Sequence, residues 1–314
     1  MTGAAGFIGS HLVERLVAMK CDVTAADSIS SFALGNLRSV EASITTCTLD
    51  LLTDDLEALL GHAQFDMIFH LAASAHVASS VDDPRRDFQR NAFATLNLLE
   101  AVRRASPHTA LIYTSSVVVY EGGGSEAIHE DGPTIPRSPY GVSKLAAERY
   151  VNVYSRLYGL RTAVLRLFSV FGPRLRKQVI FDLMGRLLDD PCLLTIRGSG
   201  QEIRDFSYID DVIDALLVVA SHAALTGEAY NVASGKPVST LMLAHLIATT
   251  MGIDPEVGFN GDTDAGDTPH WYADTSRLLA LGHLPRVSLA DGLKRTWDWR
   301  KPKLNTPSSI AIAR

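Results

Sequence analysis

Nearly continuous apolar runs alternate with amphipathic stretches through the first 172 residues of the chain. Apolar spacing typical of helices recurs over 84–105 and 138–157. The apolar and β-branched runs predict strands, and they cover 21–27, 42–50, 65–73, 108–120 and 160–172. Strands of this kind alternating with helices predict a parallel sheet covered on both faces. The predicted fold class is α/β, a doubly wound parallel sheet.

After residue 172 the alternation becomes irregular, and turn-dense segments such as GSGQEIRDF and ASGKPVS appear. This shift predicts a smaller mixed α/β region built from 173–202 and 225–300. Residues 203–224 are expected to return to the larger region, 1–172. The last residues, 301–314, are predicted to form a mobile tail.

The chain opens with a glycine-rich turn, MTGAAGFIGSH, that runs into an apolar helical pattern. Gly3, Gly6 and Gly9 permit a tight turn and a close backbone approach, and a helix amino terminus attracts pyrophosphate. A glycine-rich turn before a helix is also ordinary punctuation. Because only Met1 and Thr2 precede it, the first strand is expected to be truncated, with the true start lying upstream.

Asp27 lies 18 residues after Gly9, at the end of the first predicted strand after the glycine turn. A carboxylate at such a position accepts hydrogen bonds from the adenosine ribose and repels a 2′-phosphate, which predicts NAD rather than NADP. The alternative is an aspartate that only caps a turn.

Tyr140 and Lys144 are four residues apart at the start of a predicted helix and therefore share one face. An ammonium beside a phenol favours the phenolate and lowers the pKa of the tyrosine, so Tyr140 is a candidate general base. Ser116, at a predicted strand end, would bridge substrate and Tyr140. Alone, the spacing also fits a surface lysine beside a half-buried tyrosine.

Composition excludes several classes of protein. The 314 residues include 29 basic and 35 acidic side chains, for a net charge of −6, which argues against nucleic-acid binding. No apolar run reaches the roughly 18 residues of a membrane helix. Three scattered cysteines fit a cytoplasmic protein without a disulfide framework, and the ten histidines show no metal-binding spacing, so no metal site is predicted.

Motifs along almost the whole chain resemble the extended short-chain dehydrogenase/reductases that act on nucleotide sugars. They appear in the order TGAAGFIGSH, Asp27, Asp50-Leu51, HLAA, Asn91, TSSVVVY, SPYGVSK, LRLFSVFGPR, RDFSYIDDV and YNVASG. The resemblance implies a Rossmann-type NAD-binding domain over the larger region and substrate binding by the smaller one. It also implies a homodimer formed by the helices over 84–105 and 138–157.

The resemblance assigns roles to individual residues. The implied catalytic residues are Ser116, Tyr140 and Lys144. The implied NAD-binding residues are Gly3, Gly6, Phe7, Ile8, Gly9, Asp27, Asp50, Leu51, Leu71, Ala72, Ala73, Asn91, Tyr140, Lys144 and Phe168. The implied substrate-binding residues are Ser116, Ser169 and Arg204.

Departures from the family pattern refine the expected reaction. Dehydratases and decarboxylases of this family carry an acidic residue where Val117 and Val118 stand, and valine supplies neither acid nor base. This favours 4-epimerisation of a nucleotide sugar, with a UDP-sugar as the expected substrate. Ser169 replaces a frequent asparagine, and Asp264 stands where many relatives have an arginine for the diphosphate.

Two alternatives remain open, the first because of Ser169 and Asp264 and the second because of the truncated first strand. One is an NAD(P)-dependent ketoreductase or other oxidoreductase acting on a sugar or a secondary metabolite. The other is a dinucleotide-binding regulator without catalysis. Basic residues within 174–177 and Arg197 are candidate replacements for the diphosphate-binding arginine.

Overall fold

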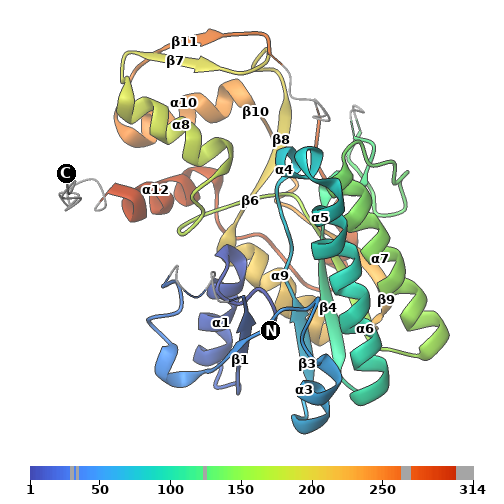
Figure 1. Cartoon of the computed structure of the whole chain (residues 1–314). Helices are drawn as coiled ribbons and strands as arrows, with labels where there is room; N and C mark the ends of the chain where they lie inside the picture. Colours follow the sequence, from blue (N-terminus) through green and yellow to red (C-terminus); the bar gives the residue numbers. More distant parts are fainter. Residues whose placement is uncertain (29–31, 33–34, 123–125, 263–269, 302–314) are drawn as a thin grey trace.

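The large sheet is entirely parallel and forms the centre of the larger region (Figure 1). The computed structural model describes residues 1–28, 32, 35–122, 126–262 and 270–301. The strands on one side of the sheet are β2 (Thr45–Thr48) and β1 (Thr24–Asp27). Those on the other side are β3 (Met67–His70), β4 (Ala110–Ser116), β5 (Thr162–Leu167) and β9 (Thr226–Val232).

The first two residues join the two halves of this sheet. Thr2 forms parallel bridges to both Ala26 and His70. Its N–H donates to the Phe69 carbonyl at 3.0 Å, and its carbonyl accepts the Leu71 N–H at 3.1 Å. The short segment expected from the sequence therefore takes the central strand position between β1 and β3, and backbone hydrogen bonding continues across the sheet.

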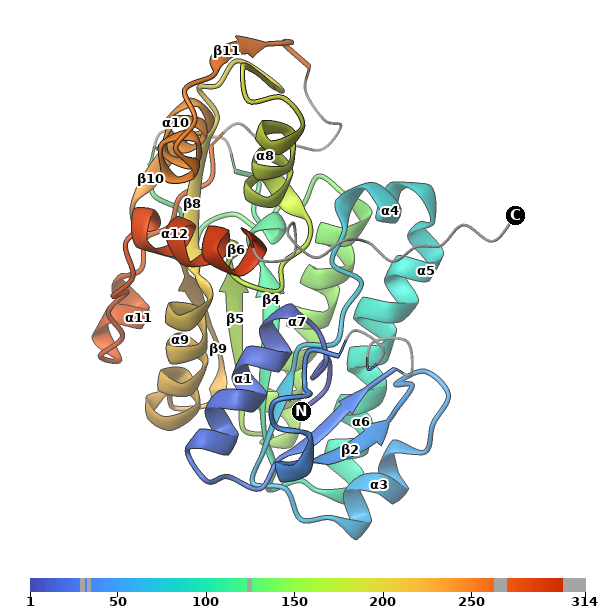
Figure 2. The same cartoon turned by 90° about the vertical axis from the view of Figure 1, so that its left-hand side faces the viewer.

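Helices cover both faces of the large sheet, as a doubly wound fold requires (Figure 2). One face carries α1 (Phe7–Ala18) and α9 (Ile209–His222), and the other carries α3 (Leu56–His62), α6 (Ala94–Ala105) and α7 (Pro139–Tyr158). Neighbouring residues of β4 show the two layers, since Ile112 packs with the first group and Leu111 with the second. The predicted α/β fold class is confirmed.

Between β3 and the helical layer the chain forms α4 (Val77–Asp82) and α5 (Pro84–Phe88). A π-helical turn, Gln89–Phe93, then leads into α6. The helix predicted over 84–105 is thus three consecutive pieces. Short 3₁₀ turns lie at Glu41–Ser43 and Val117–Val119.

The smaller region lies above the carboxyl ends of the large sheet in Figure 2. Its three-stranded sheet consists of β6 (Ser169–Phe171), β8 (Ile203–Tyr208) and β10 (Pro237–Ser239). A two-stranded sheet contains β7 (Leu193–Ile196) and β11 (Glu256–Phe259). The helices of the smaller region are α8 (Gln178–Asp189), α10 (Thr240–Met251) and α12 (Leu289–Arg300), whereas α11 (Ser276–Ala280) packs against β9 of the large sheet.

Two strands lie in a different region from the one expected from the sequence. Residues 203–208, expected in the larger region, pair as β8 with β6 and β10. Residues 226–232, expected in the smaller region, pair as β9 with β5 of the large sheet. Strand pairing between distant segments decides both cases. Residues 302–314 of the predicted tail lie outside the described residues.

Candidate active site

Two adjoining cavities open at the carboxyl ends of the large sheet. Their volumes are about 450 Å³ and 330 Å³. We call them the first and the second cavity. They share Gly3, Gly6, Leu71 and Ala73. Predicted residues lining only the first are Asp27, Asp50, Leu51 and Ala72. Those lining only the second are Phe7, Ile8, Gly9, Ser116, Tyr140, Lys144 and Phe168.

The glycine turn lies between the cavities and needs its glycines. Gly3 has φ +72°, and a Cβ there would lie 2.6 Å from the Ala72 nitrogen. A Cβ on Gly9 would overlap the Gly3 carbonyl oxygen. Helix α1 begins directly after Gly6, which supplies no side-chain cap, so the N–H groups of its first turn remain available to an anion. The turn therefore fits a pyrophosphate.

Asp27 ends β1 and lines the first cavity. Its carboxylate accepts the Ala5 N–H at 2.8 Å and the Ser28 N–H at 2.8 Å. The aspartate thus holds the glycine turn and also presents its carboxylate at the cavity. Leu51 adds an apolar wall, and the Asp50 carboxylate accepts the Leu52 N–H at 2.9 Å. This set fits the adenosine half of a dinucleotide.

Ser116, Tyr140 and Lys144 meet in the second cavity. Ser116 ends β4, whereas the other two lie one turn apart near the start of α7. The helix starts there because Ser138 caps it, accepting the Gly141 N–H at 3.1 Å. The Ser116 hydroxyl hydrogen-bonds the Tyr140 phenol, and both α7 side chains are buried.

The proton affinities of Tyr140 and Lys144 differ from the expectation based on the sequence. Burial raises the pKa of Tyr140 to about 12, opposed by the Ser116 hydrogen bond. Burial also lowers the pKa of Lys144 to about 7. The Lys144 ammonium donates to the Thr114 carbonyl at 2.6 Å and lies 4.5 Å above the Tyr113 ring. Desolvation of both groups therefore outweighs the expected lowering of the phenol pKa by the lysine.

Three predicted site residues line neither cavity. Asn91 is buried in the π-helical turn, where its side-chain oxygen accepts the Ser74 N–H at 2.8 Å. Ser169 and Arg204 lie in β6 and β8 of the small sheet. Their predicted roles in binding stay predictions. Asp264, the proposed departure at the diphosphate, lies outside the described residues.

Lys177, one of the candidate replacements for the diphosphate-binding arginine, lines the second cavity together with Gln178 and Ala75, which the sequence motifs did not single out. The Lys177 ammonium donates to the Ala75 carbonyl at 3.0 Å and joins the loops after β6 and β3. In the sequence, the position of Lys177 shortly after Gly-Pro-Arg was the feature that pointed to this residue. Arg174, another candidate, instead pairs with Glu14 of α1 at 2.6 Å.

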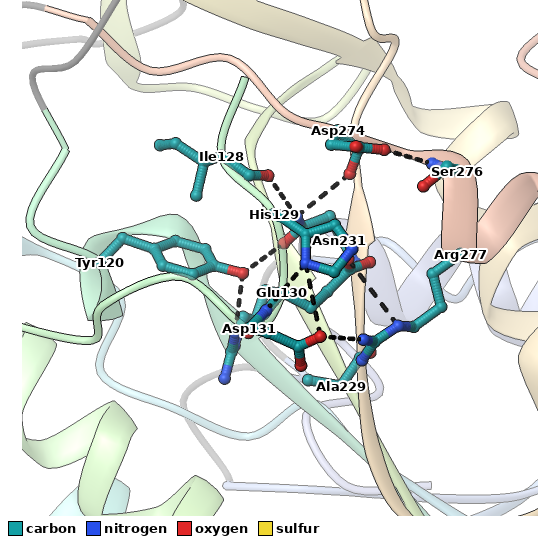
Figure 3. A network of polar contacts seen from close by, with 11 residues as sticks. Tyr120, Ile128, His129, Glu130, Asp131, Ala229, Asn231, Asp274, Ser276 and Arg277 are labelled. Atoms are coloured by element: carbon teal, nitrogen blue, oxygen red, sulfur yellow. Dashed lines mark hydrogen bonds and ion pairs between the residues drawn. The ribbon is translucent and has the colours of Figure 1, made fainter. Parts of the chain in front are cut away.

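A buried polar network fixes the segment that follows β4. The Tyr120 hydroxyl donates to the Asn231 side chain at 2.7 Å (Figure 3). Arg166 of β5 donates to the Tyr120 hydroxyl and to the Glu130 carbonyl, each at 2.7 Å, and forms a buried ion pair with Glu148 of α7. The network therefore ties β5, β9 and α7 to the connection leaving β4, next to the candidate site.

Comparison with known proteins matches this architecture to a family. The model of the NAD dependent epimerase/dehydratase family matches residues 1–233. The chain belongs to this family. Its cofactor is NAD, and the turn and first cavity described above fit that dinucleotide.

Similar proteins of known name match the chain over nearly its whole length. It is 36% identical to a UDP-glucose 4-epimerase of Mycolicibacterium smegmatis over 96% of the chain and 98% of that protein. A UDP-glucuronic acid 4-epimerase of Bacillus cereus, solved with UDP-glucuronic acid and NAD, is 32% identical with a TM-score of 0.87, covering 96% and 98%. A Thermotoga maritima UDP-glucose 4-epimerase, solved with UDP-glucose, is 30% identical with a TM-score of 0.88, also covering 96% and 98%.

The described residues also show no membrane-spanning helix and no cluster of metal-binding side chains. Within the described ranges no helix is long and apolar enough to cross a bilayer. The same residues contain no group of three or more histidine, cysteine, aspartate or glutamate side chains placed to hold a metal ion.

Proposed function

We propose that the protein catalyses NAD-dependent epimerisation of a nucleotide sugar at C4. The observation that carries this proposal is the meeting of Ser116, Tyr140 and Lys144 in a cavity that adjoins the one lined by the glycine turn and Asp27. A base, a hydroxyl and a cation are together where a substrate alcohol would meet the cofactor. The 4-epimerase names of several similar proteins support the choice of C4.

The mechanism assigns one task to each of the three side chains. Tyr140 takes the proton of the C4 hydroxyl and later returns it, and Ser116 orients that hydroxyl. Lys144 supports the phenolate electrostatically. When bound, NAD supplies the hydride acceptor and donor and a positive charge that favours the phenolate. The 4-keto sugar turns within the cavity between the two proton transfers, so its other face is reduced.

Oxidation and reduction without elimination fit the segment after Ser116. Val117 and Val118 form a 3₁₀ turn and offer no acid to a departing hydroxyl. Val117 packs against the cluster of Tyr120 and Phe168. The competing reaction is the net reduction of a keto compound, and the experiment described below distinguishes it from epimerisation.

The substrate is proposed to be a UDP-sugar, whose anionic groups require a cation at the sugar side. Lys177 is the described cation at the rim of the second cavity, apart from the buried Lys144. No carboxylate side chain lines this cavity in the described part of the chain. We assign Lys177 to an anionic group of the substrate.

A homodimer and a cytoplasmic location complete the proposal. Helices α5 to α7 and the turn between them expose large apolar side chains, among them Phe88, Phe93, Val153 and Leu157, the last 69% exposed. Such a patch is typical of an interface between subunits. The described cysteines are unbridged, as a reducing compartment favours.

The test is incubation of the purified protein with NAD and a panel of UDP-, GDP- and dTDP-sugars, read by NMR. Interconversion of a C4-epimer pair without net change in NADH is the expected result. Stoichiometric consumption of NADH or NADPH with a keto compound would show that the protein is a reductase and not an epimerase. Dinucleotide binding without any turnover across the panel and the keto compounds would contradict catalysis.

A further inference from the structure

A buried carboxylate, Asp87 of α5, lies beside the Tyr140–Lys144 pair and has no part in the mechanism above. It is 3% exposed. One carboxylate oxygen accepts the Ser143 hydroxyl at 2.6 Å, and the other accepts the Asn91 amide nitrogen at 3.0 Å. Ser143 is the residue before Lys144 on α7, so the contact brings the carboxylate to the catalytic helix.

The hydrogen bonds of Asn91 identify Asp87 as an acceptor. Asn91 must use its oxygen to accept the Ser74 N–H at 2.8 Å, which leaves its nitrogen as the atom that faces Asp87. One oxygen of Asp87 therefore accepts the Asn91 amide, and the other is hydrogen-bonded to the Ser143 hydroxyl, which also lies 3.0 Å from the Tyr140 carbonyl. These contacts hold the carboxyl group of Asp87 in place beside the catalytic helix.

The charge of Asp87 differs from that of the second carboxylate near Lys144. Glu148 forms a buried ion pair with Arg166, whose charge offsets its own. Asp87 forms no such pair with lysine, arginine or histidine in the part of the chain that the structure describes. A buried carboxylate without a bound cation acts strongly on nearby titratable groups.

The other described groups around Lys144 carry no negative charge comparable to that of Asp87. The Thr114 carbonyl and the Tyr113 ring, both from β4, are uncharged contacts. His70 of β3 is neutral, because burial and the nearby Lys144 lower its pKa to about 3. Asp87 raises the pKa of Lys144 and also that of Tyr140.

We infer that Asp87 is a positioning residue: held by Ser143 and Asn91, it is the buried counter-charge of Lys144 and sets the pH range in which the Tyr140–Lys144 pair works. This inference rests on the proposed function of that pair. It also assigns a task to Asn91 of the π-helical turn, which orients the carboxylate. Asp87 itself does not touch the reacting atoms in this scheme.

The sign of the effect follows from charge. In the proposed mechanism the Tyr140–Lys144 pair is active when the two side chains together hold one titratable proton. The pair gains activity as it loses its first proton and loses activity as it loses its second, and these two macroscopic steps form the two limbs of the pH profile. The negative charge of Asp87 favours the protonated form at both steps. Replacing Asp87 by asparagine therefore moves both limbs of the pH profile to lower pH, by about 1 unit, as is typical of a nearby buried charge. A residue needed only for packing would lower the maximum and leave the limbs in place.

The experiment uses Asp87→Asn in the NAD-loaded protein and follows kcat/KM against pH. Exposed Asp82→Asn, which removes the same charge from the neighbouring helix α4, is the matched control and should leave both limbs unchanged. Asp87→Glu keeps the charge and should retain limbs close to those of the wild type. Unmoved limbs in Asp87→Asn, or equal shifts in Asp82→Asn, would overturn the inference.

A second readout needs no sugar and so separates this inference from the proposed function. The phenolate absorbance of Tyr140 is titrated as the difference between each protein and the same protein carrying Tyr140→Phe. Asp87→Asn should ionise at lower pH than the wild type, whatever substrate the enzyme uses. If Asp87→Asn does not fold, Asp87→Ser, which keeps a polar partner for Ser143, enters the same titration with the same expected sign. An unchanged phenolate titration contradicts the role of Asp87 even if the epimerase assay succeeds.

Discussion

The cofactor side and the sugar side of the site are built in different ways. On the cofactor side, predicted residues from the glycine turn, Asp27 and the strand ends line two continuous cavities. On the sugar side, Ser169 and Arg204 belong to a separate small sheet and line neither cavity, whereas Lys177 does. The glycine turn of the cofactor side rests on backbone constraints within a few residues, whereas Lys177 meets Ala75 through packing between distant segments. The two sides should therefore respond differently to substitution.

The largest effect should come from the point where the two sides meet, Tyr140. Tyr140→Phe removes the proton-transferring oxygen but keeps the ring in its buried position. We expect turnover to fall roughly 10²–10⁴-fold, the usual contribution of a general acid–base group. NAD affinity, measured by calorimetry, should change little. Full activity in this variant would remove Tyr140 from the mechanism.

The next effect tests the backbone of the cofactor side. Gly9→Ala places a Cβ against the Gly3 carbonyl and 2.9 Å from the Ala4 Cα, so the turn must move away from the pyrophosphate position. NAD affinity should fall by about 10²-fold, a loss of about 2.7 kcal/mol. Gly61→Ala is the matched control, because no atom lies within 4 Å of a Cβ there. Equal NAD affinity in the two variants would show that the turn is mere punctuation.

The same difference explains how much could be predicted from the sequence. The alternation of apolar runs and helices predicted the sheet, and the spacing of Tyr140 and Lys144 predicted their common face. The sequence did not show that Thr2 bridges β1 and β3. Nor did it show that residues 203–208 pair in the small sheet and residues 226–232 in the large one. Strand pairing joins segments far apart in the chain, and a local pattern carries no information on it.

The proton affinities of the site were also beyond the sequence. The four-residue spacing correctly suggested that Lys144 and Tyr140 lie together, but the spacing carries no information on burial. In the structure, desolvation dominates the pKa of each group. Asp87 likewise gives no sequence signal of its own, because its burial depends on the packing of α5 against α7.

A smaller effect should separate the two readings of Asp27. Asp27→Asn keeps an oxygen that can accept the Ala5 N–H but removes the charge that repels a 2′-phosphate. NAD affinity should fall by about 10-fold, and the preference for NAD over NADP should shrink by a similar factor. Dissociation constants for both dinucleotides measure this, with exposed Asp22→Asn as control. An unchanged preference would make Asp27 only a turn cap.

The smallest effect should lie on the sugar side, at Lys177. Lys177→Met keeps the apolar stem but removes the ammonium that bridges to Ala75 across the second cavity. Since the cation is at the rim and partly screened by water, we expect KM for the nucleotide sugar to rise by about 5- to 10-fold, with kcat and NAD affinity nearly unchanged. Raising the salt concentration should weaken substrate binding in the wild type more than in the variant. Lys294→Met, on the exposed side of α12, is the matched control. An equal KM in both variants would mean that the anion is held by residues of the small sheet, and the contrast between the two sides of the site would then disappear.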